Sequence, residues 1–210
     1  MATNTYGLTT VTRMRNRLAI TVTDSTLDSV ITRMIYAATD YIERYCGNTR
    51  FLRLTYTNEI YNGSDPDDGT PLPYLVLKNQ PLSSVTALQY RVGERSSPSW
   101  VDFGANDYEP DYELGIIRMF GKLPYGTQNI RVSYVAGYLI DFTNENDGAL
   151  HTLPHEISDL CERLVTKLFK RRQSEGRSQE GFESSAITWG SFLEEHDKNI
   201  LANYNRVPIV

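Results

Sequence analysis

Apolar residues recur at every third or fourth position in two separate stretches of the chain. In the first stretch the repeat consists of Leu27, Val30, Ile31, Met34, Ile35, Ala38, Tyr41, Ile42 and Tyr45. These steps place the apolar side chains on one face of an α-helix, which buries that face in a core. Asp24 or Ser25 can cap the start of this helix, and Gly47 suits the position just after its end. Nearer the N-terminus, Thr9 or Thr10 can cap a short helix.

The second repeat lies in the C-terminal third of the chain. It consists of Ile157, Leu160, Cys161, Leu164, Val165, Leu168 and Phe169. Pro154 precedes it, and proline is favoured at the first position of a helix; Thr152 can serve as the cap. The spacing therefore predicts a long helix that begins near Pro154.

Between these stretches the period changes from helical to extended. Runs rich in β-branched and aromatic residues, bounded by Gly, Pro, Asn and Asp, occupy 51–61, 74–77, 85–91, 115–120 and 130–135. Such runs are typical of strands joined by turns. We expect a small antiparallel sheet or partial barrel over 51–138.

Beyond the long helix the chain is polar, glycine-punctuated and yet carries apolar residues. Residues 171–190 read RRQSEGRSQEGFESSAITWG, 191–205 have a short helical pattern, and the chain ends in RVPIV. Extended apolar ends are costly to leave in water. The segment 174–210 is interpreted as an arm that a partner orders, and the alternatives are a linker, an end packed on its own domain or a disordered end.

These patterns predict an α+β fold in a single domain, 1–210. A helical frame consists of an N-terminal helix pair and a long C-terminal helix. The antiparallel sheet or partial barrel at 51–138 is inserted into this frame, and the arm at 174–210 carries a short helix.

Composition changes this picture little. Lys and Arg number 21 against 26 Asp and Glu, a net charge of −5, so the chain is a poor candidate for gripping nucleic-acid phosphates over a broad surface. Cys46 and Cys161 each lie on an apolar helix face and are expected to be reduced core residues, as in a cytoplasmic protein. We expect no signal peptide and no membrane span, because the sequence lacks the apolar runs that both require.

Catalytic, cofactor and metal motifs are not recognisable in the sequence. His151 and His155 stand four apart in HTLPHE, which is not the HExxH pattern of zinc proteases. Cys161 belongs to an apolar repeat, where a thiolate is disfavoured. The acidic loops SDPDDG and DFTNENDG lack the ligand spacing of a calcium loop and are interpreted as solvated turns. We therefore predict no catalytic residue, no cofactor and no metal site.

The order of several segments resembles a known family. These are DYIERYCGNTRF at 40–51, NQPLSSVTALQYR at 79–91, IRVSYVAGY at 130–138, LPHEISDLCERLVTKLFKRR at 153–172, GRSQEGFESSAITW at 176–189 and NYNRVPIV at 203–210. In this order they resemble the head–tail connector, or adaptor, proteins of tailed bacteriophages. The resemblance spans almost the whole chain, and its motifs are structural rather than catalytic.

The resemblance implies a structural protein of the virion neck, assembled in the host cytoplasm. Such adaptors form a ring, of twelve subunits, beneath the portal protein and bind a stopper or tail protein on the other side. DNA passes through the channel without specific binding, and no membrane is involved. The C-terminal segment reaches the portal, which gives the predicted portal or inter-subunit interface: Phe182, Ile187, Trp189, Phe192, Tyr204, Arg206, Val207, Pro208, Ile209 and Val210.

Two other function classes remain open from the residues alone. One is a small hydrolase with an unrecognised site around His151, His155 and Glu156. The other is a DNA-binding module that uses the basic residues Lys167, Lys170, Arg171, Arg172 and Arg177. Most of these cations end a helix, where they also complement the carbonyl end of its dipole.

Overall fold

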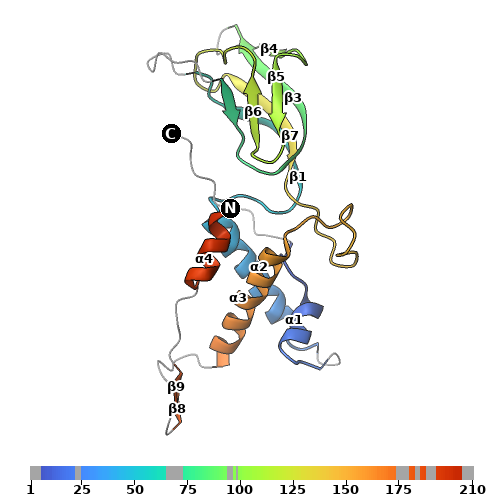
Figure 1. Cartoon of the computed structure of the whole chain (residues 1–210), viewed down its shortest axis with the longest axis vertical. Helices are drawn as coiled ribbons and strands as arrows, with labels where there is room; N and C mark the ends of the chain where they lie inside the picture. Colours follow the sequence, from blue (N-terminus) through green and yellow to red (C-terminus); the bar gives the residue numbers. More distant parts are fainter. Residues whose placement is uncertain are drawn as a thin grey trace. The chain divides into compact units, whose positions relative to one another are not determined.

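The computed structural model describes residues 6–21, 25–64, 73–93, 97, 99–173, 180–182, 185–187 and 193–204 (Figure 1). The chain divides into two compact units. One comprises Met1–Thr49 with Ile140–Val210 and is called the helical unit; the other, Arg50–Leu139, is called the β unit. The α+β fold with helices around an inserted antiparallel region and a short C-terminal helix confirms the predicted fold class.

The helical unit contains α1 (Val11–Arg17), α2 (Asp28–Tyr45), α3 (His155–Gln173) and α4 (Glu195–Ala202). α1, α2 and α4 each pack against α3. Much of the core comes from the two predicted repeats, of which these residues are buried: Ile31, Ile35, Ala38, Ile42, Ile157, Leu160, Cys161, Leu164 and Val165. Leu8 and Met14, which precede both repeats, are buried as well. Two short strands, β8 (Glu180–Phe182) and β9 (Ser185–Ile187), form a separate antiparallel hairpin.

Helix ends follow local chemistry, with one correction. Thr10 caps α1 by accepting a hydrogen bond from the Arg13 amide, and Gly47 adopts a positive φ of 77° just beyond α2. The predicted cap of α2 at Asp24 or Ser25 is wrong for Ser25, because Leu27 occupies the cap position and its side chain has no oxygen to accept a bond; Asp24 lies outside the described residues. A turn precedes the helix instead, in which the Ser25 carbonyl accepts from the Asp28 amide.

The β unit contains two antiparallel sheets. The four-stranded sheet has the order β1 (Leu54–Tyr61), β7 (Ile130–Ala136), β3 (Leu82–Val92), β4 (Ser99–Asp102). The three-stranded sheet has the order β2 (Tyr74–Val76), β6 (Ile116–Met119), β5 (Tyr108–Asp111). β7 is central, and its alternate residues Ile130, Val132, Tyr134 and Ala136 are buried, as expected for a strand with one face in a core.

One glycine is required where β7 ends. Gly137 has a φ of 105°, and a Cβ there would lie 2.6 Å from the Leu52 carbonyl oxygen. A side chain would therefore collide with the backbone that passes beside β7. This close approach also explains why the Leu52–Tyr138 bridge can form next to it.

Candidate interaction surface at the C-terminus

α4 packs against the apolar core of its own helical unit. Leu193, just before the helix, is 4% exposed, and Leu201 near its end is fully buried. The Cys46 thiol, at the end of α2, donates to the Leu201 carbonyl at 3.9 Å. Residues 193–204, which belong to the predicted arm, therefore pack on the chain's own core.

Ion pairs fix the position of α4 along α3. The Asp197 side chain is 1% exposed and accepts from the Arg163 guanidinium at 2.5 Å. Glu194, immediately before the helix, accepts from the Lys167 ammonium at 2.8 Å. Because a buried carboxylate needs a charged partner, Asp197 ties α4 to this stretch of α3.

Asp197 also takes part in capping the start of α4. Its carboxylate accepts from the Glu194 amide at 3.0 Å, and the Glu194 side chain accepts in return from the Asp197 amide. This reciprocal arrangement is a capping box, which satisfies amides that a helix start leaves free. Asp197 is not among the residues predicted from the sequence, although its spacing of three from Glu194 is the signal of a capping box.

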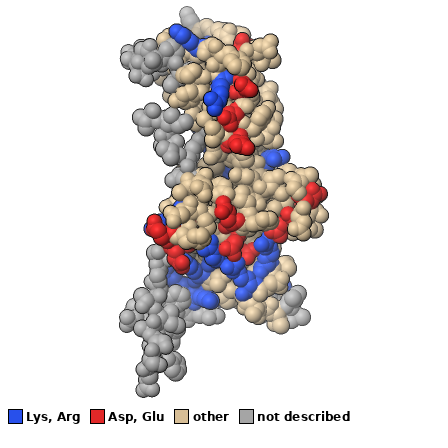
Figure 2. Space-filling model, in the orientation of Figure 1, with Lys and Arg blue, Asp and Glu red and all other residues tan. Residues whose placement is uncertain are grey.

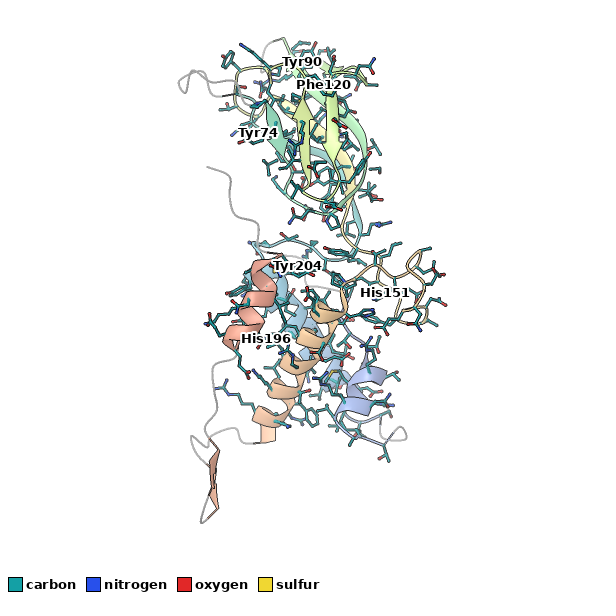
Figure 3. All side chains as sticks on the ribbon, in the orientation of Figure 1. Tyr74, Tyr90, Phe120, His151, His196 and Tyr204 are labelled. Carbon is teal, nitrogen blue, oxygen red and sulfur yellow. The ribbon has the colours of Figure 1, made fainter. Side chains whose placement is uncertain are left out.

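The contact of Tyr204 shows in which direction α4 runs along α3. The Tyr204 hydroxyl donates to the Glu156 carboxylate at 2.5 Å, at the N-terminal end of α3 (Figure 3). Contacts thus pass from Lys167 to Arg163 to Glu156 as α4 proceeds, so α4 runs antiparallel to α3. Tyr204 accordingly lies beside the beginning of α3.

The ten predicted interface residues are unequally placed. Tyr204 has the contact just given, within its own unit. Phe182 and Ile187 lie in β8 and β9, where the backbone register pairs Phe182 with Ser185 and Glu180 with Ile187. The others lie outside the described residues: Trp189, Phe192, Arg206, Val207, Pro208, Ile209 and Val210.

A second charged cluster holds α1 on α3. The Glu162 carboxylate is 8% exposed and accepts from Thr9 Oγ1 at 3.0 Å, Arg13 Nε at 2.7 Å and Arg17 Nη1 at 3.0 Å. Arg13 also binds Glu145 at 2.7 Å, which lowers the pKa of that carboxyl. These contacts hold both α1 and the loop before α3 in place.

The histidines of the hydrolase hypothesis take part in this packing. His151 is buried, its Nδ1 accepts from the Asp141 amide at 3.1 Å, and its ring stacks against that of His155. His155 is 74% exposed on its side chain, with Nδ1 3.3 Å from Glu145. Both rings thus support the loop, together with the Phe142 ring, and the described loop residues 143–148 line an open polar hollow of about 480 Å³.

The thiols are poor nucleophiles. Burial raises the pKa of Cys161 to about 12, and burial together with the nearby Glu43 raises that of Cys46 to about 12. A thiol with such a pKa is almost entirely protonated at neutral pH. Within the part of the chain that the structure describes, no three His, Cys, Asp or Glu residues are placed to hold a metal ion.

The basic residues of the DNA-binding hypothesis are partly neutralised. Lys167 binds Glu194, whereas Lys170, Arg171 and Arg172 are exposed at the end of α3; Arg177 lies outside the described residues. On the visible face of the helical unit, Lys and Arg groups border directly on Asp and Glu groups (Figure 2). Several cations of this unit, among them Arg13, Arg17 and Arg163, are ion-paired within the chain, which reduces the charge that a phosphate-binding surface would need.

The β unit exposes large apolar side chains that the sequence analysis did not single out. Phe120, labelled in Figure 3, lies just after β6 and is 69% exposed. Tyr112, Leu114 and Tyr125 are each about half exposed. Exposed aromatic residues are enriched at protein interfaces. None of the described helices is long and apolar enough to cross a bilayer.

No family model matches the sequence, and no curated protein matches it either. Among solved structures, the chain aligns with one from "Neck of empty GTA particle computed with C6 symmetry", over 95% of this chain and 90% of that chain, with 16% identity and a TM-score of 0.50. The chain shares its fold with this chain of a particle neck.

The shared fold extends over both units, since the alignment covers nearly the whole chain. GTA denotes a phage-like gene transfer agent, so the shared fold is consistent with the resemblance to head–tail connectors that the order of motifs indicates. A chain of "Neck of native GTA particle computed with C12 symmetry" aligns with the same coverages, 15% identity and a TM-score of 0.47.

Proposed function

We propose that the chain is a structural protein of a particle neck, a head–tail adaptor that connects the capsid to the tail. The observation that carries this proposal is the fold shared with a particle-neck chain, which matches over nearly the full length of both chains. At 16% identity the likeness concerns the fold, and the order of motifs along the sequence supplies the second, independent line of support.

The adaptor forms a ring beneath the portal. The similar neck structure has C6 symmetry, and closed rings arise when each subunit joins the next through two different surfaces. Twelve copies, the number that the family resemblance implies, are compatible with six-fold symmetry. The DNA passes through this ring, and a net charge of −5 opposes tight, non-specific binding to it.

The C-terminal residues 206–210 contact the portal, and a stopper or tail protein binds the other side of the ring. α4 supports this assignment because it anchors the chain next to residue 204 through Tyr204 and Asp197. An apolar end held at a fixed point can insert into a partner at a low cost in conformational entropy.

The adaptor works without catalysis, in the neck of a particle assembled in the host cytoplasm. In support, the two thiols are buried and protonated, and His151 and His155 hold a loop in place. Ion pairs occupy Lys167, one of the cations that a DNA-binding module would use.

Co-sedimentation with portal-bearing particles that lack the neck tests this function. The purified chain is expected to sediment with the particles at a saturating ratio of one ring per portal. A variant that lacks 206–210 should keep the melting temperature of the full chain and bind portal more weakly. A full chain that stays in the supernatant at every concentration would contradict the adaptor proposal. A large fall in the melting temperature of the shortened chain would show that residues 206–210 belong to the core of the domain.

A further inference from the structure

The connection between α3 and α4 is much longer than the path it covers. α3 ends at Gln173 and α4 begins at Glu195, so the connection is 174–194, 21 residues. Glu194 nevertheless contacts Lys167, which lies six residues before the end of α3, or about 9 Å along the helix. Connections between antiparallel helices usually need only about 2–8 residues.

The excess length gives α4 a wide reach. The β8–β9 hairpin occupies 180–187, which leaves 13 residues, 174–179 and 188–194; at up to about 3.5 Å per residue these can span about 45 Å. This reach exceeds the width of a helical unit of this size. The connection can therefore place α4 either on its own α3 or on the α3 of an adjacent copy.

The contacts that hold α4 on α2 and α3 do not require the connection between α3 and α4. Leu193 and Leu201 are buried, Asp197 binds Arg163, and Tyr204 binds Glu156. None of these contacts depends on the covalent connection to α3. The same site on another copy would offer the same contacts, so exchange of α4 between copies costs little in contact energy.

We propose that α4 is exchanged between neighbouring copies in the assembled ring, where it occupies the α2–α3 site of the adjacent subunit. The inference rests on the proposed function, because only a ring places a second site permanently within reach. In the free chain α4 occupies its own site, as in the structure. Exchange in the ring ties each subunit to the next through a whole helix.

Cross-linking of the Lys167–Glu194 contact tests the exchange. Both side chains are accessible, at 33% and 65% exposure, and both can be replaced in one chain, Lys167→Cys with Glu194→Cys. A short bifunctional thiol reagent should close this pair within single chains before portal is added. In rings assembled on portal, the same reagent should link chains into a covalent ladder on a denaturing gel.

Matched variants make each outcome decisive. Arg17→Cys with Asp159→Cys marks the α1–α3 contact, 2.8 Å in the native chain, and should close only within chains in both states. The unmodified chain, with Cys46 and Cys161 buried, should give no product. In rings mixed from the two single variants, Lys167→Cys and Glu194→Cys, the exchange predicts a linked dimer.

Rings that give only single-chain products, or no product at this contact, would overturn the exchange while leaving the adaptor function intact. The absence of a linked dimer in the mixed rings would count in the same way. If the native chain forms no ring on portal at all, the adaptor function itself fails. The two failures are therefore distinguishable.

Discussion

Glu162 is the carboxylate on which the attachment of α1 to α3 most depends. It is nearly buried and accepts three hydrogen bonds, from Thr9, Arg13 and Arg17. Glu162→Gln keeps the shape of the side chain but removes its charge. The amide nitrogen also turns a donor toward a guanidinium, so at least one of the three bonds is lost.

The expected loss in the free energy of unfolding is about 2–3 kcal/mol. A hydrogen bond to a charged group contributes about 1.5–3 kcal/mol, and removal of one partner of a buried ion pair costs about 3–5 kcal/mol. The cost here lies at the lower end because Arg13 keeps Glu145 and Arg17 keeps Asp159 as partners. Both of those pairs are partly exposed, so each compensates only in part.

Urea unfolding followed by circular dichroism at 222 nm measures this change, because the helices lie in the helical unit. The midpoint should fall while the slope with urea stays constant. Glu195→Gln is the matched control, since Glu195 is 78% exposed and forms an exposed ion pair with Lys198 on the same helix; it should cost less than about 0.5 kcal/mol. An equally small effect of Glu162→Gln would refute the assigned role of the cluster.

Three further predictions concern other features of the chain. Arg13 lowers the pKa of Glu145, so this ion pair stabilises the fold at pH values above the ordinary carboxyl pKa of 4.5, and its contribution disappears as the pH falls through the lowered pKa. Melting temperatures measured between pH 6 and 3 should therefore fall less steeply in Arg13→Gln than in the native chain. Parallel curves would contradict this. Cys46 and Cys161 should not react with Ellman's reagent in the native chain, and both should react in denaturant; rapid labelling of the folded chain would contradict their burial. Gly137→Ala should destabilise the β unit by about 2 kcal/mol or more, because the new Cβ collides with the backbone at a residue of positive φ. The near-ultraviolet circular dichroism transition should then occur at a lower urea concentration. An unchanged midpoint would contradict the close approach.

The sequence predicted elements well where one face is buried. α2 and α3 follow from their apolar repeats, and β7 follows from the β-branched and aromatic run at 130–135. β4 and β5 escaped prediction because they are short strands without a fully buried residue, and β5 contains Pro110 at the edge of its sheet. The spacing of apolar residues reflects which side chains are buried, so it does not reveal strands with so little buried surface.

The candidate surface was harder to predict than the fold. Asp197 reads as an ordinary polar residue of a helix, and its burial depends on Arg163 and Lys167, some thirty residues earlier. The register between α4 and α3 is likewise set by long-range contacts that no local pattern contains. The portal interface at 206–210 remains a prediction from the family resemblance and the apolar character of the tip.

Electron microscopy of the purified chain with portal-bearing particles that lack the neck tests the central claim most directly. The account predicts class averages with an added ring on the portal, of six- or twelve-fold symmetry, which is absent from particles without the chain. Bare portals at saturating concentrations of a folded, monomeric chain would contradict it.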